Sequence, residues 1–418
     1  MKEGISIFYL NSEKPYELFK QASSDPYYVD KSMLLAGISE KSVCISRPRG
    51  FGKTTNALMV ACYFSNAFDS SGLFRNLKIY RSAHHVDHQN RRTVIFIPFG
   101  ELPPKCATYK TYINSIRRNL ISDLHEAYPS VECAGDEPSE VLTAIYQSTG
   151  ERFMFVLDDW DFIFRPESSF RSKVASDEDK YDYLTFLHIL LDGQYVLMAY
   201  MTGIYPLPLK LWSYAPDMFK EYTVASKEFK QFFGFNGTEV QSLLKRYNAQ
   251  FKEGEKRNIH YEDLRFWYSY GYLCNPYSTI RALRTNKLDF YWLGAAPKNE
   301  MLNILKQSRD ECGRELAVLI SRGYYQQDSC FSVFLPFENF TNKDNGLSLL
   351  ATLGYFIVYE KGEFFIHCHF HVPNHEIQSN IKAIIDTEET YSNIRELSHA
   401  FPKLRDAILS FNKAEVAS

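Results

Sequence analysis

Residues 46–54 read Ser46-Arg47-Pro48-Arg49-Gly50-Phe51-Gly52-Lys53-Thr54. The short apolar run Val43–Ile45 precedes them, and a helical pattern follows from Thr55 to Tyr63. A strand, a glycine-containing loop, Gly-Lys-Thr and a helix form the layout of a phosphate-binding P-loop. In such a loop the backbone N–H groups turn inward to hold phosphate oxygens, and the N-terminus of the helix adds positive potential. The stretch therefore predicts a phosphate site at the start of a helix.

The motif assigns a role to individual side chains. Lys53 is expected to reach the β- and γ-phosphates, and the Thr54 hydroxyl is expected to ligate Mg²⁺. Arg47 stands where the usual G-x-x-x-x-G-K-[ST] spacing has its first glycine. Because Gly-Lys-Thr is a common tripeptide, a basic turn leading into a helix is the alternative interpretation, and a second motif is needed.

The second motif lies further along the chain, where the apolar run Phe153–Leu157 ends in Asp158 and Asp159. Such a run suits a central parallel strand that is covered on both faces. An acid at the end of that strand lies where ligands bind in open α/β sheets. Asp158 is therefore interpreted as the Walker-B aspartate that holds Mg²⁺. The alternative, an acidic turn after a buried strand, fits less well beside a P-loop.

Asp159 follows the expected metal ligand directly. It occupies the position where many P-loop ATPases carry Glu to polarise the attacking water. The Asp side chain is one methylene shorter than Glu, so its reach is reduced. Asp161 is the competing carboxylate, because in a continuing strand it would share a face with Asp159.

Further stretches match one known family in order. They are Tyr27–Ser32, Arg47–Asn56, Leu157–Asp161, Thr202–Ile204, Phe233–Phe235, Trp267–Tyr268, Tyr270–Tyr272, Asn275–Ser278, Tyr291-Trp292, Gly354-Tyr355 and Val372–Ile377. Together they resemble the AAA-ATPase-like domain family, P-loop proteins that are often fused to a PD-(D/E)xK nuclease. The family also lacks the first P-loop glycine, in agreement with Arg47, whereas Asp159 departs from the family's Glu.

The two motifs and the resemblance together predict ATP and Mg²⁺ as cofactors. The residues expected to bind the nucleotide are Arg49, Gly50, Phe51, Gly52, Lys53, Thr54 and Thr55. The expected metal ligands are Thr54 and Asp158, and the expected catalytic residues are Lys53, Asp159 and Thr202. Thr202 ends the strand after Walker B, where it either senses the γ-phosphate or caps a turn. Arg47 and Arg49 either lie beside the nucleotide or brace the loop.

Alternating strand and helix patterns predict an α/β fold with a parallel, doubly wound sheet. The expected strands are Val43–Ser46, Thr93–Pro98, Phe153–Leu157, Tyr195–Thr202 and Tyr222–Ala225, with helical patterns such as Thr108–His125 and Tyr181–Leu191 between them. Five segments are predicted: a lead-in over 1–40, a P-loop NTPase domain over 41–230, a helical lid over 231–300, a C-terminal winged-helix-like module over 301–380 and a helical tail over 381–418.

The predictions for the segments after residue 230 rest on local sequence patterns. Asn236 is a good N-cap with Glu239 three residues on. A helical stretch, Leu302–Val318, precedes two strand runs, Tyr355–Tyr359 and Glu363–Val372, which are expected to form a hairpin. For two sets of side chains, the sequence allows either a structural or a binding role. Trp267, Tyr268, Tyr270 and Tyr272 are either the aromatic core of the lid or a platform for bases. His367, His369 and His371 are either the polar side of a strand or zinc ligands.

Composition limits the functional classes and cellular compartments that the chain can belong to. The 418 residues carry a net charge of −3, so there is no global basic footprint for nucleic acid. The eight cysteines form no C-x-x-C pair, which favours a reducing, intracellular compartment, cytoplasmic or nuclear. No apolar stretch has the roughly 20 residues of a membrane span. A nucleic-acid or protein partner and a homo-oligomer remain open.

The leading hypothesis is a Mg²⁺-dependent ATPase that couples its nucleotide state to conformational change. The alternative is a nucleotide-binding regulatory or interaction protein with little hydrolysis, a hypothesis suggested by Asp159 in place of Glu. Nuclease activity is not expected, because the tail after residue 380 is shorter than such a domain and contains no Glu-x-Lys.

Overall fold

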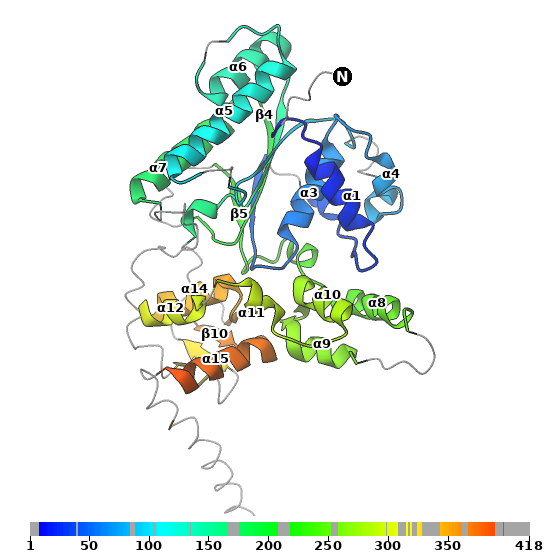
Figure 1. Cartoon of the computed structure of the whole chain (residues 1–418), viewed down its shortest axis with the longest axis vertical. Helices are drawn as coiled ribbons and strands as arrows, with labels where there is room; N and C mark the ends of the chain where they lie inside the picture. Colours follow the sequence, from blue (N-terminus) through cyan, green and yellow to red (C-terminus); the bar gives the residue numbers. More distant parts are fainter. Residues whose placement is uncertain are drawn as a thin grey trace, which may run out of the picture. The chain divides into compact units, whose positions relative to one another are not determined.

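The computed structural model divides the chain into two compact units (Figure 1). Unit 1 comprises Met1–Arg47 and Gly52–Phe233, and unit 2 comprises Pro48–Phe51 and Gly234–Ser418. The structure describes residues 8–38, 41–83, 88–102, 106–133, 135–165, 175–207, 218–251, 258–297, 299–307, 315–316, 318–319, 324–327, 343–361, 367–388 and 396.

Unit 1 is built on a five-stranded parallel sheet. Its strands are β1 (Ser42–Ser46), β2 (Thr93–Pro98), β3 (Phe153–Asp158), β4 (Val196–Gly203) and β5 (Lys220–Tyr222), in the order β2-β3-β4-β1-β5. Every residue of β3 is buried, as its continuous apolar run predicts for a strand covered on both faces. The predicted α/β fold with a parallel sheet is confirmed.

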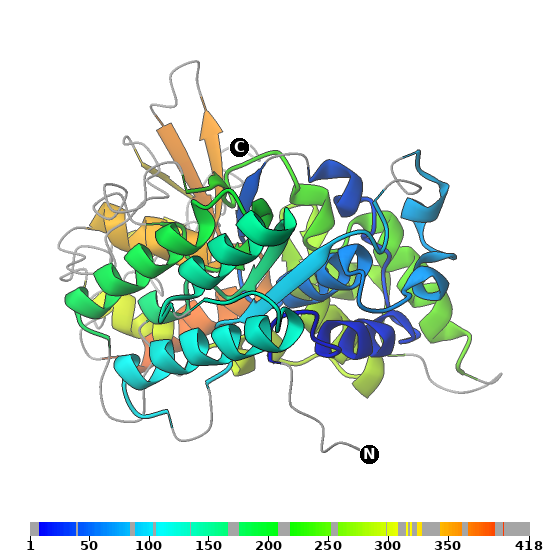
Figure 2. The same ribbon diagram turned by 90° about the horizontal axis from the view of Figure 1, so that it is seen from above.

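Helices cover both faces of this sheet. On one face lie α5 (Tyr109–Ala127), α6 (Pro138–Thr149) and α7 (Asp177–Leu191), and on the other lie α1 (Lys14–Ser23) and α3 (Lys53–Phe64) (Figure 1). Figure 2 shows the sheet between these two helical layers from above. Two short helices, α2 (Leu34–Gly37) and α4 (Ser71–Phe74), complete the described helices of the unit. Since α3 is buried along most of its length, it belongs to the core of unit 1.

Helix α7 and strand β5 differ most from the predicted bounds in unit 1, and the other predicted elements differ by two residues or fewer at each end. Helix α7 begins at Asp177 and not at Tyr181, because Ser176 caps it in a reciprocal capping box. Strand β5 spans Lys220–Tyr222 and not Tyr222–Ala225. It pairs with Val43–Ile45 of β1, and the Tyr222 and Thr223 carbonyls accept hydrogen bonds from the Arg47 side chain, so the ladder ends at Tyr222.

Unit 2 contains helices and two small antiparallel sheets. The helices are α8 (Gly237–Asn248), α9 (Tyr261–Tyr268), α10 (Pro276–Thr285), α11 (Tyr291–Ala295), α12 (Glu300–Gln307), α14 (Lys343–Leu353) and α15 (His375–Thr387). Strands β6 (Ser269–Tyr270) and β7 (Leu273–Cys274) pair with each other. Strands β8 (Tyr324–Gln327), β9 (Ile357–Lys361) and β10 (His367–His371) form a sheet in the order β8-β10-β9.

Several local predictions for unit 2 hold. Asn236 caps α8, accepting from the Glu239 N–H at 2.9 Å, and the Glu239 carboxylate returns a contact to the Asn236 N–H at 2.8 Å. Strands β9 and β10 form the expected antiparallel pair, whereas β8 was not predicted. The connection between β9 and β10 and most of the predicted tail lie outside the described residues. The winged-helix-like module and the five-segment division stay predictions.

The aromatic side chains of the predicted lid lie partly in the core of unit 2 and partly at its surface. Tyr268 is buried and donates its hydroxyl to the Asp289 carbonyl, while Tyr272 is half exposed. Among the described helices, none is long and apolar enough to cross a membrane.

Candidate functional site

The loop after β1 adopts the conformation that its glycines allow. Gly50 has φ 75° and Gly52 has φ 84°, in the left-handed region that residues with a Cβ rarely enter. Gly52 is also the N-cap of α3, and its carbonyl accepts the first helical hydrogen bond from the Asn56 N–H at 3.0 Å. The helix therefore begins at Lys53, at the C-terminal end of the parallel sheet, as a P-loop requires.

The Lys53 ammonium lies inside unit 1. The residue is only 7% exposed, and Nζ donates to the Arg47 carbonyl at 3.0 Å. Burial lowers the pKa of Lys53 to about 8, while the charges of Asp159, Asp161 and Asp158 oppose that shift. The ammonium thus lies in a low-dielectric setting among carboxylates, and it rests on a backbone oxygen.

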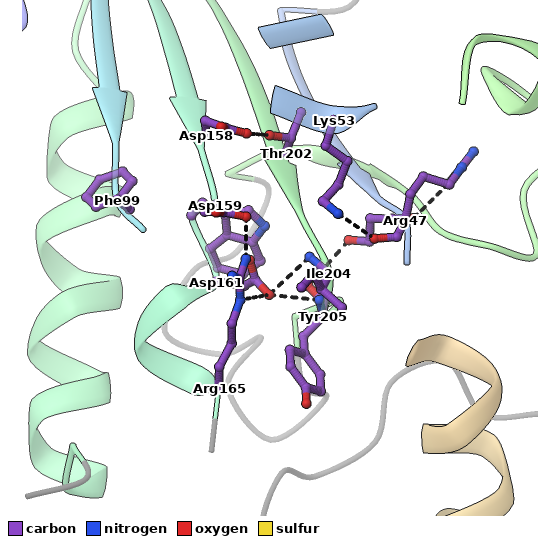
Figure 3. A network of polar contacts seen from close by, with 12 residues as sticks. Arg47, Lys53, Phe99, Asp158, Asp159, Asp161, Arg165, Thr202, Ile204 and Tyr205 are labelled. Carbon is purple, nitrogen blue, oxygen red and sulfur yellow. Dashed lines mark hydrogen bonds and ion pairs between the residues drawn. The ribbon is translucent and has the colours of Figure 1, made fainter. Parts of the chain in front are cut away.

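Asp158 is the point where three elements of unit 1 meet. It ends β3 directly opposite Thr202 of β4, and the Thr202 hydroxyl donates to its carboxylate (Figure 3). A side-chain hydrogen bond also joins it to Thr54 of α3. Burial, and then the charge of Asp159, raises the pKa of Asp158 to about 6, and the two hydroxyl contacts and Lys53 oppose this rise. The sequence-predicted metal ligands are therefore together.

Thr202 is fully buried at the end of β4, and its hydroxyl contacts the Asp158 side chain. Because the hydroxyl is used in this contact, Thr202 does not simply cap a turn. Its side chain also has no direct access to solvent. The role of Thr202 as a sensor near the γ-phosphate stays a prediction.

Asp159 points away from the line of β3. Its φ of 56° breaks the strand, a conformation that Asp tolerates better than most residues. Its carboxylate is 28% exposed and accepts from Arg165 Nη2 at 2.5 Å. The strand therefore does not continue to Asp161, and the two carboxylates do not share a face.

Asp161 is turned into the core and has no solvent exposure. It accepts from the Ile204 N–H at 3.1 Å and the Tyr205 N–H at 2.9 Å, both just beyond β4. Arg165 completes its contacts, with Nη2 at 2.7 Å and Nε at 3.2 Å (Figure 3). Asp161 thus holds the backbone and Arg165, which favours Asp159 over Asp161 as the water-positioning carboxylate; that role stays a prediction. Arg165 was missed by the sequence reasoning, since no motif marks an arginine at that position.

Arg47 braces the loop. Its buried guanidinium donates to the carbonyls of Ser46 at 2.8 Å, Tyr222 at 2.9 Å, Thr223 at 2.6 Å and Glu228 at 3.2 Å. These carbonyls lie on β1, on β5 and in the segment after β5, so the side chain closes the sheet edge. Of the two alternatives for Arg47, the structure favours bracing.

Arg49 is engaged within unit 2. Its guanidinium pairs with Glu300 at 2.8 Å, and the Tyr355 hydroxyl donates to the same carboxylate at 3.0 Å. The Arg49 carbonyl accepts from Trp292 Nε1 at 2.9 Å and Asn275 Nδ2 at 3.2 Å. Its side chain therefore braces the loop tip as well, and Glu300 is a partner that sequence reasoning missed.

The remaining predicted binding residues occupy different surroundings. Phe51 is buried and its ring packs edge-on against Tyr270, so the ring belongs to the core of unit 2. A Cβ at Gly50 would come within 3.0 Å of Asn275 and Tyr277. In unit 1, Thr54 is exposed and Thr55 is half-buried.

One face of strand β10 carries stacked aromatic rings. His369 and His371 stack on each other and on Tyr324, and Tyr359 meets His371 edge-on. In the described part of the chain, no group of three or more His, Cys, Asp or Glu side chains is arranged to hold a metal ion. The side chain of His367 lies outside the described residues.

Replacing the brace tests its structural role. Arg47→Met should lower the free energy of unfolding by about 3 kcal/mol, because several buried carbonyls lose a charged donor. Urea denaturation measures this loss. The exposed Arg152 provides the control, and Arg152→Met should change stability by under about 0.5 kcal/mol. A loss below about 1 kcal/mol for Arg47→Met would show that the brace is dispensable.

The raised pKa of Asp158 predicts a pH dependence without nucleotide or Mg²⁺. The folded chain retains the Asp158 proton up to about pH 6, above the unfolded pKa of 3.8, so the folded state loses stability as the pH rises through that window. Asp158→Asn removes this titration. The free energy of unfolding of Asp158→Asn, minus that of wild type, should therefore be about 2 kcal/mol larger at about pH 7 than at about pH 4.5. Urea denaturation at both pH values checks this, and a pH-independent difference would contradict it.

One family model and several solved structures are similar to this chain. Residues 17–210 match the family model described as "AAA-ATPase_like: Predicted AAA-ATPase". No curated protein matches the chain. Among solved structures, a Walker-type ATPase of Pyrococcus abyssi is 12% identical, with 84% of this chain and 94% of that chain covered and a TM-score of 0.40. The ORC2 protein of Aeropyrum pernix, solved as ADPNP–ADP complexes, is 13% identical, with 96% and 98% covered and a TM-score of 0.39.

The family match begins before β1 and ends after β4, so it contains the P-loop, Asp158, Asp159 and Thr202. It agrees with the ordered motifs and with the parallel sheet that carries them. The chain is therefore similar to the AAA-ATPase-like family over residues 17–210, a little under half of its length.

Proposed function

We propose that this chain binds ATP with Mg²⁺ and hydrolyses it, and that the nucleotide state changes its conformation. One observation carries the proposal. Thr54 from α3, Asp158 from β3 and Thr202 from β4 meet through hydrogen bonds, and the Lys53 ammonium lies in the same cluster of charges. These residues are far apart in sequence, and they converge at the start of the helix that follows the glycine loop.

The phosphates would be held by Lys53 and by the backbone N–H groups from Arg49 to Thr54. Lys53 now rests on the Arg47 carbonyl, a neutral acceptor, and a phosphate oxygen is a stronger partner for an ammonium. Lys53 is therefore expected to leave that carbonyl when a nucleotide binds.

The donor set suits a small hard cation. A threonine hydroxyl and a carboxylate already in contact offer the oxygen ligands that Mg²⁺ prefers, so Thr54 and Asp158 would hold it. When bound, Mg²⁺ supplies neutralisation of phosphate charge. Asp159, the neighbouring and partly exposed carboxylate, would orient the attacking water.

The loop tip supplies a route for coupling. Pro48–Phe51 make their contacts in unit 2, where Glu300 and Trp292 hold Arg49. A shift of the loop on phosphate binding would therefore act directly on these partners.

A second function is favoured by one specific observation. The Asp159 carboxylate is held by Arg165, and it is a methylene shorter than the Glu of the family. A chain that keeps this pair in the nucleotide complex would bind ATP and act as a regulatory switch with little turnover. Measuring ATP turnover by the purified chain, with and without DNA or RNA, decides between the two functions.

Lys53→Ala tests nucleotide binding. Loss of a charge-assisted phosphate contact should weaken ATP affinity by about 10- to 100-fold, while the fold persists because a buried charge is removed. Calorimetry with ATP and Mg²⁺ measures the affinity, and thermal unfolding checks the fold. The exposed Lys14 is the matched control, and Lys14→Ala should bind as wild type. Unchanged affinity in Lys53→Ala would remove the P-loop assignment.

Asp159→Asn tests hydrolysis. The variant should keep its ATP affinity and lose about 10²- to 10⁴-fold in turnover, since the acceptor charge for water is gone. Asp159→Glu should maintain or raise turnover, because it restores the longer reach of the family's residue. If wild type shows no turnover above the Lys53→Ala background, and Asp159→Glu gains none, the regulatory function replaces the enzyme.

A further inference from the structure

Arg165 is a buried cation whose position neither motif explains. It follows the 3₁₀ turn Phe162–Phe164, and its side chain is 10% exposed. Its charge acts on Lys53, so the two cations belong to one electrostatic cluster with Asp158, Asp159 and Asp161. Figure 3 shows the Arg165 guanidinium directed at Asp159 and Asp161.

The two carboxylate partners of Arg165 are not equivalent. Asp161 is fully buried, contacts Arg165 through both carboxylate oxygens and is itself fixed by the Ile204 and Tyr205 N–H groups. A bidentate pair of this kind is sufficient to neutralise a buried guanidinium. Asp159 is partly exposed, accepts from Arg165 Nη2 at Oδ1 and stands at a left-handed backbone position. Asp161 is therefore the permanent anchor, and Asp159 is the partner that can be exchanged.

We propose that Arg165 is a catalytic arginine supplied in cis, which exchanges Asp159 for the γ-phosphate of ATP while Asp161 keeps it anchored. This inference rests on the proposed function and deepens it. One exchange then does two things. It brings a second cation to the transferring phosphoryl group, where charge is stabilised in the transition state. It also releases the Asp159 carboxylate to accept a hydrogen bond from water.

The reaction that this arrangement serves is hydrolysis of the bond between the β- and γ-phosphates. The water oxygen bonds to the γ-phosphorus, and the bond from that phosphorus to the β–γ bridging oxygen breaks. ADP leaves with the electron pair of that bond, inorganic phosphate forms, and the water proton passes to Asp159 and then to solvent. Arg165 stays protonated throughout, because guanidinium groups remain charged in proteins.

The proposal predicts discrimination between nucleotides. Only ATP carries the γ-phosphate, so Arg165 should contribute to ATP binding and turnover and not to ADP binding. A purely structural role for the Asp161–Arg165 pair would instead weaken both nucleotides equally. The ratio of ATP to ADP affinity therefore separates the two roles.

The test uses Arg165→Gln in the full chain, with Arg117→Gln as the matched control. Arg117, on α5, is also paired with two carboxylates, Glu137 at 3.3 Å and Asp182 at 3.9 Å. In Arg165→Gln, ATP affinity should fall about tenfold with ADP affinity within about twofold of wild type, and turnover should fall about 10³-fold. In Arg117→Gln, all three quantities should stay within about twofold of wild type.

Other outcomes would overturn the inference. Unchanged turnover and an unchanged ATP to ADP ratio in Arg165→Gln would show that the arginine never meets the γ-phosphate. An equal loss for both nucleotides would make the residue structural. If Arg165→Gln does not fold, Arg165→Lys decides, because a lysine keeps the charge beside Asp161. It should retain ADP affinity and lose turnover, and wild-type turnover in Arg165→Lys would overturn the inference.

Failure of the proposed function is recognised separately. A wild-type chain that binds ATP no better than Lys53→Ala would overturn both statements together. A wild-type chain that binds and hydrolyses ATP, with Arg165→Gln unaffected, would overturn the arginine inference alone.

Discussion

The buried Asp161 carboxylate is the contact on which the site depends. It has no exposure to water, so its charge must be met within the protein, and the Ile204 and Tyr205 N–H groups and Arg165 meet it. A Cβ at Gly203 would approach Asp161 to 2.7 Å, so the glycine after Thr202 is needed for this close passage. Asp161 thereby fixes the end of β4 against the segment that follows β3.

The same constraint organises the charges around it. Lys53 and Arg165 carry two positive charges, and Asp158, Asp159 and Asp161 carry three carboxylates, all mostly buried in unit 1. Water reaches Asp158 and Lys53 poorly, and this burial raises the pKa of Asp158 to about 6 and lowers that of Lys53 to about 8. Such a preorganised cluster suits phosphate chemistry, because charge that develops during the reaction meets fixed partners in a low dielectric.

The two arginines that flank Pro48 serve the loop. Arg47 satisfies carbonyls at the edge of the parallel sheet, and Arg49 pairs with Glu300 in unit 2. Arginine suits both positions, because its planar guanidinium donates several hydrogen bonds in fixed directions and stays charged when buried. In the proposed nucleotide complex, the phosphate contacts of the loop would therefore fall to Lys53 and the backbone.

The sequence by itself determined the parallel sheet, the glycine loop and the α8 cap. Apolar runs, left-handed glycines and an N-cap are local signals, and they give β3, Gly50, Gly52 and Asn236 directly. The two sequence motifs also marked Lys53 and Asp158 as residues of the candidate site. Only the tertiary structure decided what Arg47, Arg49 and Asp161 do, and it alone brought out Arg165. Their partners lie up to 251 residues away, as in Arg49–Glu300, and no local pattern encodes a contact formed between distant segments. The break of β3 at Asp159 likewise became visible only in the backbone, because a left-handed aspartate leaves no periodicity in the sequence.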